Sequence, residues 1–531
     1  MFNTLKKPVN TIFLIEIVVV FLVAFGVIPR STILGLAILI GLFVLWADLE
    51  TATAFFVRSV PVFVAIPLTP YFDSFNIWRI ASGLIFLKWF FAEKKLTQIK
   101  TSYRKIASNL NFQEYRLSFF TLVILVFSLF SLIVADDLIG GIKRIIYFTN
   151  LSLIGFVVHD LVWKKPEIAR NLVKNILLSG IIVAIAAVAQ LASAYLVSIY
   201  EFMDFWAGSV QLGFYGSVWS QTAQEANTWF AYFGPQLSLR IFSTLPDSHS
   251  FPIFMLLAIP ALMAFSITKI FQTGQVSRLK KLVKTRASLL VILIPIFFLL
   301  TILSGTRGIW LAVLGPIVTL PFLLKLSRNI SDKNILKYLS LFFILFIMLF
   351  PTAYPIFGSD QFQIKKTGSE ILTKRIRSIL DLEETSNNGR IAIWKASIAS
   401  IIKRPLLGVG IGNFPVVLSQ ETEYAKAGSS AHNLYLTIAA EIGILGLLAT
   451  LGILLLILKG GLTVFWSSTN TFNKIYSASF VLYTIWVLFY SLTDAALFDE
   501  RAFLIFAVNS AIILALKKPS KVEGANWRSG I

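Results

Sequence analysis

The chain has 531 residues, of which 56% are hydrophobic, and its mean hydropathy is +0.78. This composition excludes an ordinary soluble globular protein, because a soluble fold must cover its core with a polar surface of similar extent. The formal net charge of +20 does not indicate a nucleic-acid partner, because most lysines and arginines fall in short loops between apolar runs.

Fourteen apolar runs approach or reach the length of about 17 to 25 residues that a membrane-spanning helix needs. In chain order they are residues 11–28, 32–47, 52–68, 76–92, 117–135, 145–163, 175–198, 250–267, 287–304, 308–324, 338–355, 431–458, 478–492 and 502–516. The first run has no small-residue cleavage site after it, so we expect a retained helix rather than a signal peptide. Two short runs contain Arg58 and Arg79, charges that must face a polar interior, and the expected count is therefore about 12 to 14 spans. The sequence predicts an all-α, polytopic membrane protein with a single integral membrane domain over residues 1–531.

Alternate loops are rich in lysine and arginine. They are residues 94–116, 164–174, 269–286, 325–337 and the tail from Lys517. The positive-inside rule therefore predicts that these loops and both termini face the cytoplasm. Two long polar loops, 199–248 and 356–430, then lie outside.

The large extracytoplasmic loop 356–430 is basic despite its predicted side of the membrane. Its cations are Lys365, Lys366, Lys374, Arg375, Arg377, Arg390, Lys395, Lys403 and Arg404. The positive-inside rule does not govern long loops, so an anionic ligand or membrane lipids would account for this charge. Apolar residues recur at helical spacing from Ile391 to Ile402, between a possible cap at Asn388 and the helix breaker Pro405. This pattern predicts a short amphipathic helix on the outer membrane surface or over the bundle.

Three arginines stand near predicted helix ends on the outer side: Arg240, Arg307 and Arg390. A guanidinium binds phosphoryl oxygens with a planar pair of donors, and helix N-terminal amides near Arg390 would favour the same anion. Arg307 lies in a turn of a few residues between two apolar runs, which predicts a position near the outer mouth of the bundle. The alternative for each is a solvated arginine or one that faces lipid headgroups.

His432 follows the second long loop, at the start of an apolar run. A histidine can take a proton from a hydroxyl near neutral pH, which makes His432 a candidate general base, although a capping or interface role is the alternative. His249 is a second candidate because it lies near Arg240 in the sequence. Asp247 beside it fits a helix N-cap. His159 lies at the cytoplasmic end of a predicted helix and is assigned no role.

Several segments together resemble the O-antigen ligase and O-antigen polymerase superfamily. They are Asn388–Trp394, Arg404–Phe414, Ala431–Leu436 and Glu441–Gly446, with weaker similarity at Ser304–Gly308 and from Arg240 to His249. The resemblance covers roughly residues 240–457, which would form the catalytic core. Ligases, polymerases and some protein O-oligosaccharyltransferases share these motifs, so the acceptor stays open.

The resemblance implies a metal-independent, inverting membrane glycosyltransferase without a cofactor. It would transfer or polymerise glycan from a polyprenyl-diphosphate-linked donor onto a sugar hydroxyl of a glycan or lipid-core acceptor. The reaction would take place at the outer face of the bacterial cytoplasmic (inner) membrane, in surface polysaccharide or O-antigen biosynthesis. His432 would be the base, and Arg240, Arg307 and Arg390 would bind the diphosphate. His249 is also assigned to substrate binding, at a position where the family more often has asparagine.

Other functions are consistent with parts of the sequence. Asp136 and Asp137 could bind a divalent cation, but no third ligand is recognisable, and the absence of cysteine excludes thiolate sites. The glycine-rich run 408–413 lacks the strand and helix of a nucleotide loop and is more consistent with a flexible turn that folds the loop back over the bundle. The aromatic residues between 200 and 233 could stack on sugars or form an interfacial belt. Glu441 fits a structural or acceptor-side group. A lipid-linked oligosaccharide flippase or transporter is the alternative function, although it would place ionisable residues along a midplane path.

Overall fold

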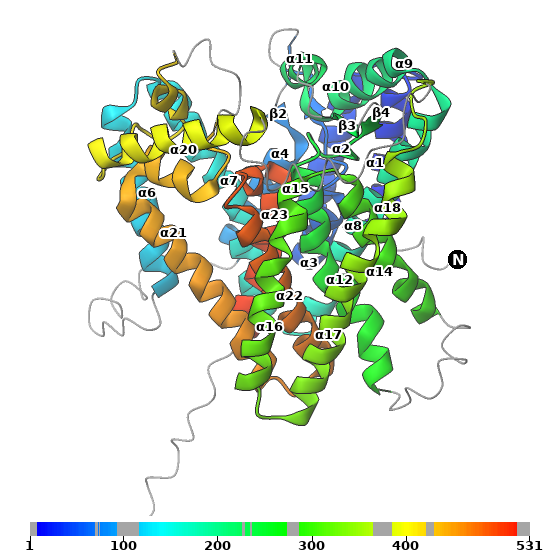
Figure 1. Ribbon diagram of the computed structural model, residues 1–531, viewed down its shortest axis with the longest axis vertical. Helices are drawn as coiled ribbons and strands as arrows, with labels where there is room; N and C mark the ends of the chain where they lie inside the picture. The colour runs from blue at the N-terminus through cyan, green and yellow to red at the C-terminus, as the bar shows by residue number, and fades with distance from the viewer. Residues whose placement is uncertain are drawn as a thin grey trace, which may run out of the picture.

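The computed structural model describes residues 8–69, 73, 75–92, 116–225, 229–233, 236–272, 286–364, 385–420 and 430–517. These residues form a bundle of long helices that run roughly parallel to the longest axis of the molecule (Figure 1). Among the described residues, eight helical stretches are long and apolar enough to cross a membrane: Leu117–Val134, Leu138–Lys164, Ile168–Leu196, Ser250–Thr268, Arg307–Leu326, Ile330–Phe357, Leu434–Ser467 and Thr471–Tyr490. The predicted all-α, polytopic membrane protein is confirmed.

The N-terminal half consists of seven longer helices and one short hairpin. They are α1 (Pro8–Ala24), α2 (Thr32–Trp46), α3 (Leu49–Ser59), β1 (Ala65–Ile66), β2 (Phe75–Asn76), α4 (Ile77–Ala92), α6 (Arg116–Ser131), α7 (Leu138–Lys164) and α8 (Ile168–Leu196). A 3-10 turn, η2 (Leu132–Val134), follows α6. The short strands β1 and β2 pair antiparallel, with Ala65 opposite Asn76.

The predicted span 52–68 is wrong in its second half, because α3 ends at Ser59 and the chain then leaves the helix. Pro61 interrupts the helical hydrogen bonding at this point. The carbonyl oxygens of Pro61 and Phe63 instead accept hydrogen bonds from the buried Arg501, at 3.1 and 2.7 Å. An arginine from near the C-terminal end of the sequence thus supplies the hydrogen-bond donors that these carbonyl oxygens would otherwise lack.

Arg58 faces the interior of the bundle, as its charge required. Only 9% of the residue is exposed. Its Nε donates to Asn175 Oδ1 at 2.8 Å and its Nη1 to Asn10 Oδ1 at 2.5 Å. The guanidinium also lies over the Phe13 ring, 5.4 Å from its centroid. Two amides and one ring therefore replace the water that this cation would lose in a membrane.

The loop after α8 folds into a cap of short elements at one end of the bundle (Figure 1). They are α9 (Ile199–Met203), the π-helical turn η3 (Asp204–Gln211), α10 (Leu212–Tyr215), α11 (Ser217–Glu225), β3 (Phe230–Phe233) and β4 (Gln236–Leu239). Phe202, Trp206, Phe214 and Trp229 are buried, whereas Tyr200 and Tyr232 are 84% and 64% exposed. Much of the predicted aromatic belt therefore forms the core of this cap.

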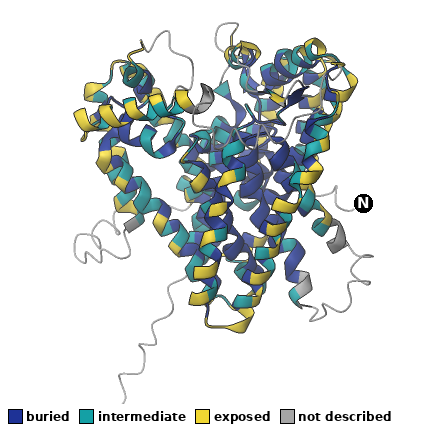
Figure 2. Cartoon of the chain, in the orientation of Figure 1, coloured by how far each residue is buried: buried dark blue, intermediate teal, exposed yellow. Residues whose placement is uncertain are grey.

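The C-terminal half supplies the centre of the bundle. Its elements are α12 (Ser250–Gln272), α14 (Arg286–Leu303), α15 (Arg307–Ala312), α16 (Leu314–Leu326), α17 (Ile330–Met348), α18 (Phe350–Phe357), α20 (Thr385–Lys403), η5 (Phe414–Leu418), α21 (Leu434–Ser467), α22 (Thr471–Tyr490), η6 (Ala496–Phe498) and α23 (Glu500–Leu516). α12 packs against α8, α14, α22 and α23, and its span is 94% buried. Figure 2 shows this buried centre surrounded by helices with exposed outer faces, as expected for a bundle that meets lipid.

α20, α21 and α6 form a lobe beside the central bundle (Figure 1). α21 bends at Gly443, whose φ of +80° is the left-handed conformation that glycine adopts easily. The turn that follows α20 packs into this bend: Val409 N donates to Ala440 O, and Ile444 N donates to Pro405 O, both at 2.8 Å. The glycine-rich run therefore packs directly against the bend of α21.

The described parts of the two long predicted outer loops lie at the same end of the bundle. Figure 1 shows α9, α10 and α11 at the end where α20 also lies, opposite the connection between α16 and α17. Lys365, Lys366, Lys374, Arg375 and Arg377, which contribute to the predicted basic loop, lie outside the described residues.

Candidate functional site

His432 occupies a strained backbone position just before α21. Its φ is +47°, a region that residues other than glycine rarely adopt. Asn433 caps the helix, since its Oδ1 accepts from the backbone N–H groups of Tyr435 and Leu436, both at 3.0 Å. Asn433 Nδ2 also donates to Leu492 O at 2.8 Å. His432 thus precedes the helix and is partly exposed, as a side chain that meets a substrate must be.

The residue before His432 is tied to α20. Trp394 Nε1 donates to Ala431 O at 2.9 Å, and Ala431 N donates to Thr437 Oγ1 at 3.1 Å. α20 begins at Thr385, so the predicted N-cap at Asn388 is wrong: that residue lies within the helix. Arg390 is consequently more than one turn from the helix start, and the N-terminal amides predicted beside it are not adjacent to its position.

Arg240 lies at the end of β4, where a buried polar network holds the chain. Arg240 N donates to Trp229 O at 2.7 Å. Two residues later, Gln190 Oε1 accepts from the backbone N–H groups of Phe242 and Ser243, both at 2.9 Å. Each buried N–H is satisfied by a specific side chain or carbonyl, so the segment that carries Arg240 has a defined conformation.

Arg501 also holds the segment that follows Arg240 in place. It is 0% exposed, donates to the carbonyl oxygen of Thr244, and also holds the two carbonyls of the broken α3. Its Cζ lies 4.8 Å from the Phe214 ring centroid and 4.5 Å from that of Tyr215. Tyr215 Oη donates to Thr244 O at 3.0 Å. One buried cation therefore joins the cap, the broken helix and the segment between Arg240 and His249.

The turn between α14 and α15 packs directly on Arg240. Arg240 Nε donates to Ser304 O at 3.2 Å and its Nη2 to Thr306 Oγ1 at 3.1 Å. Gly305 has a φ of +63°, and a Cβ there would lie 3.0 Å from Arg240 Cγ, so the turn requires glycine. Arg307 begins α15, and its charge acts on Arg240. Arg240 and Arg307, two of the three arginines predicted to bind phosphate, are thus close together.

His249 contacts an acidic side chain of the loop between α22 and α23. Its Nδ1 lies 3.0 Å from Asp494 Oδ2, in the loop between α22 and α23. Asp247 Oδ1 accepts from the backbone N–H groups of His249 and Ser250, both at 2.8 Å, so the predicted N-cap at Asp247 is confirmed. Thr306 Oγ1 donates to Ser248 O at 2.7 Å and links this histidine to the arginine turn.

Asp494 is the point on which the predicted residues converge. Burial alone would raise its pKa, but the nearby positive groups of His249, His432 and Arg390 hold that pKa below its usual range. Asp494 is therefore a carboxylate at neutral pH. Arg390 and His432 thus lie within electrostatic range of the same carboxylate as His249, although they come from distant parts of the sequence.

Arg240 remains a cation in this setting. Burial lowers its pKa to about 10, against the opposing effects of Tyr490, Asp247 and Asp494. This value still leaves the guanidinium charged at neutral pH. The structure thus brings Arg240, Arg307, Arg390, His249 and His432 into one region. Arg240 follows β4, His249 and His432 precede α12 and α21, Arg307 begins α15, and Arg390 lies within α20. Chemically, the arrangement offers hydrogen-bond donors and positive charge to an anion, beside an imidazole that can accept a proton.

Asp494 is the residue of this cluster that the sequence did not single out. Little in the sequence indicates that Asp494 belongs to a site. Asp494 begins the acidic stretch 494–500, which the sequence shows only as an outer loop with little positive charge. The pairing with His249 depends on contact between α12 and the loop after α22, 245 residues apart, and local patterns do not report such contacts.

The alternative cation site at Asp136 and Asp137 is not supported by the structure. Asp137 caps α7, with its Oδ1 accepting from Gly140 N at 2.8 Å. Asn413 Nδ2 donates to Asp137 O at 3.1 Å. Within the described ranges, no three or more of the residues His, Cys, Asp and Glu are grouped as they would be to hold a metal ion.

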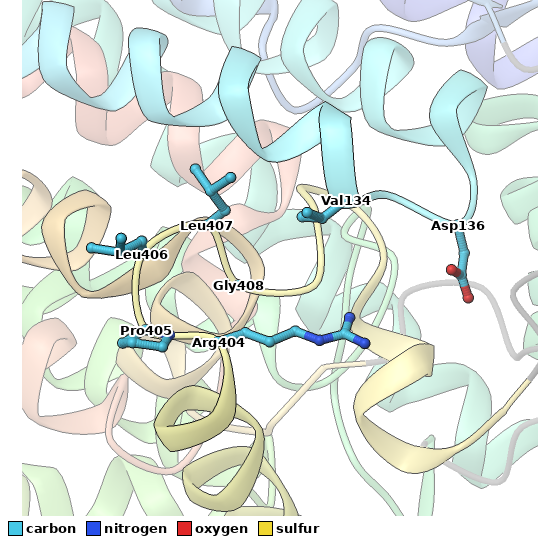
Figure 3. Close-up of a pocket in the computed structure, with 7 residues that line it drawn as sticks. All are labelled: Val134, Asp136, Arg404, Pro405, Leu406, Leu407 and Gly408. Atoms are coloured by element: carbon cyan, nitrogen blue, oxygen red, sulfur yellow. The ribbon is translucent and has the colours of Figure 1, made fainter.

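A pocket of about 520 Å³ lies away from this cluster, between the end of η2 and the turn after α20. Its lining is Val134, Asp136, Arg404, Pro405, Leu406, Leu407 and Gly408. Figure 3 shows the Arg404 side chain extended along the pocket and Asp136 on a separate segment of chain. Neither the histidines nor the three predicted arginines line it, so this pocket is separate from the candidate site.

The fold and the site define a polytopic membrane protein with a cationic, histidine-containing centre at one end of its bundle, suited to an anionic substrate. Residues 289–451 match the family model described as O-antigen ligase. This match confirms the resemblance to the O-antigen ligase and polymerase superfamily and supports a role as a ligase or polymerase of lipid-linked glycans. The matched segment contains Arg307, Arg390 and His432. No match was found among curated proteins.

Proposed function

We propose that this protein transfers glycan from a polyprenyl-diphosphate-linked donor to a sugar hydroxyl at the outer face of the cytoplasmic membrane. The observation that carries the proposal is the convergence on Asp494 of His249, His432 and Arg390, with Arg240 and Arg307 in the same region. Such a centre combines stabilisation of a leaving diphosphate with a base for the attacking oxygen.

In the proposed reaction, the acceptor hydroxyl gives its proton to His432 and its oxygen attacks the anomeric carbon of the donor. The bond from that carbon to the diphosphate breaks, and the configuration inverts. Arg240, Arg307 and Arg390 stabilise the negative charge that develops on the departing diphosphate. The Asp494 carboxylate keeps His249 in place beside this region and offsets part of the surrounding positive charge.

The proposal includes a metal-independent reaction and a membrane orientation with both termini in the cytoplasm. The catalytic core is proposed to span residues 240–457, and the loop 356–430 would cover it. Arginine donors take the place that a divalent cation has in other diphosphate-releasing enzymes. Transfer in the presence of a strong chelator tests the first point, and labelling of engineered cysteines from either side of the membrane tests the second.

Purified protein in detergent or nanodiscs, supplied with lipid-linked glycan, tests the whole assignment. His432→Gln and Arg390→Gln should each lower the rate of transfer by about 10² to 10⁴-fold, since each removes a group that acts in the transition state. Lys459→Gln is a matched control, because Lys459 lies within α21 well beyond the bend. Near wild-type transfer by either site variant would contradict the assignment. Movement of glycan lipid across vesicles without any change in the glycan would instead indicate a flippase.

A further inference from the structure

Two arginines from different helices converge on one tyrosine ring, outside the cluster around Asp494. Arg79 is near the start of α4, and its Cζ lies 5.6 Å from the centroid of the Tyr147 ring. Arg144 is on α7, and its Cζ lies 5.9 Å from the same centroid. Both arginines are partly exposed, yet the Nε of each is buried without a hydrogen-bond partner among the described residues. Incompletely satisfied cations are costly and concentrate at binding sites.

Aromatic rings surround both guanidinium groups. Arg79 also lies 5.8 Å from the Phe75 centroid, and Arg144 lies 5.1 Å from Phe148 and 5.9 Å from Phe498. The partly exposed rings of this Arg79–Arg144 cluster are Phe75, Tyr147, Phe148 and Phe498. They come from three separate regions of the chain, so the fold, and not one local motif, assembles the patch.

Carboxyl groups bring the cluster close to electrical neutrality. The charges of Asp499 and Glu500 act on Tyr147 together with those of the two arginines, and Glu441 is near Arg144. Asp499 caps α23, and burial, with neighbouring Glu500, raises its pKa to about 7, so it carries only part of a negative charge at neutral pH. These carboxyl groups therefore offset part of the charge of the two arginines. A strongly charged diphosphate would gain little here compared with the arginines around Asp494.

The composition of the cluster fits a sugar. Guanidinium and carboxylate groups supply planar donors and acceptors for hydroxyl groups, and partly exposed aromatic rings supply apolar faces for the C–H groups of a pyranose. A site with several rings and a few polar groups is also the usual composition of a small-ligand site.

The cluster is close to the reacting centre along the chain. Tyr147 Oη donates to Phe498 O at 3.2 Å, and the Phe148 and Phe498 ring centroids are 4.8 Å apart. Phe498 lies four residues after Asp494, which contacts His249. Four residues span at most about 14 Å. The loop between α22 and α23 thus has the reacting centre at one end and the Arg79–Arg144 cluster at the other.

We infer that the Arg79–Arg144 cluster is a glycan subsite that binds a sugar unit of the substrate away from the bond that forms. This inference rests on the proposed function, which supplies the kind of substrate. It adds that Arg79 and Arg144 would let the protein distinguish long glycans from short ones. A glycan that reaches both ends of the loop gains contacts that a shorter one lacks.

Transfer measured with acceptor glycans of increasing length tests this inference. The double variant Arg79→Gln/Arg144→Gln should raise KM with the longest acceptors by about tenfold or more, the loss expected from hydrogen bonds to charged groups. With the shortest acceptor the loss should be about twofold at most, and kcat should change little throughout. Arg328→Gln is the matched control, because Arg328 is an exposed arginine in the connection between α16 and α17, at the opposite end of the bundle (Figure 1). An equal loss at every length, or a length dependence identical to that of the wild type, would overturn the inference.

A binding measurement separates failure of this inference from failure of the proposed function. Free oligosaccharide released from the host's own glycan should raise the melting temperature of the purified wild-type protein and of His432→Gln, but not that of the double variant. Binding without transfer by the wild type would overturn the proposed function and leave the subsite standing. Stabilisation by inorganic phosphate alone, dependent on Arg79 and Arg144, would overturn the sugar assignment in favour of an anion site.

Discussion

The contact between His249 and Asp494 allows a quantitative test of the site's electrostatics. Asp494→Asn keeps the shape of the side chain and removes its charge. When His249 is protonated, two unit charges 3.0 Å apart attract each other by roughly 5.5 kcal/mol at an effective dielectric constant of 20. The side chains are 19% and 9% exposed, so the loss of hydration offsets much of this attraction, and we expect a net coupling of about 2 kcal/mol.

A double-mutant cycle measures this coupling. The free energy of unfolding in mild detergent is determined for the wild type, Asp494→Asn, His249→Gln and the double variant. A coupling of about 2 kcal/mol supports an ion pair within the folded site, since water would reduce the attraction between exposed groups to below about 1 kcal/mol. A coupling under about 0.5 kcal/mol would refute the assignment of the contact as an ion pair.

The same variant predicts a pH dependence of known sign. Nearby positive charges outweigh burial and lower the pKa of Asp494 in the folded protein. A carboxyl with a lowered pKa stabilises the folded state above the ordinary aspartate pKa of about 4, and this contribution is lost as the pH falls through the lowered value. The difference in melting temperature between wild type and Asp494→Asn should therefore shrink as the pH falls below about 4. An unchanged difference at pH 3 would contradict the reasoning.

Three further variants probe how the site is held. Trp394→Phe should lower kcat by about three- to tenfold, because it removes one hydrogen bond beside the base, whereas Trp466→Phe at a distant helix end should have little effect. Gly443→Ala should lower the free energy of unfolding by at least about 2 kcal/mol, because its Cβ would lie 2.0 Å from a backbone oxygen, while Gly83→Ala in open space should be neutral or stabilising. Arg501→Met should abolish accumulation of folded protein, because it leaves the carbonyl oxygens of Pro61 and Phe63 without donors, each at a cost of about 1 to 3 kcal/mol, and removes one of the two donors to Thr244 O.

The helices of this protein were predictable because hydrophobic length alone specifies a membrane span. The predicted runs coincide with helices, and errors arise where backbone polar groups find partners far away in sequence. The segment after α3 illustrates this, because its apolar residues predict a continued helix. Arg501, more than 400 residues later, satisfies its carbonyl oxygens in a non-helical conformation. No local pattern can report such a partner.

The candidate site likewise contains some residues that local motifs identify and others that depend on contacts between distant parts of the chain. His432 and Arg390 stood out as candidates in the sequence because their neighbours form recognisable short motifs at the predicted outer face. The role of Asp494 was not predictable, because an acidic residue in a short outer loop also fits ordinary membrane topology. The Arg79–Arg144 cluster was missed for a related reason: Arg79, a charge within an apolar run, signals only a need for a polar partner, and Arg144 precedes the run 145–163 without a motif of its own. Which rings and carboxyl groups surround it depends on how α4, α7 and α23 pack.

The Ala-His-Asn motif can now be explained residue by residue. Ala431 is fully buried, and its carbonyl oxygen accepts the Trp394 hydrogen bond, so a larger side chain would displace α20. Asn433 caps α21 and also binds the loop that leads to Asp494. Between these two fixed neighbours, His432 is held in a left-handed conformation that a free chain would leave. Because strain of this kind persists only where surrounding contacts impose it, the motif places an imidazole at a set position. If His432 is the base, as proposed, substitution of either neighbour should lower the rate of transfer although His432 itself is unchanged.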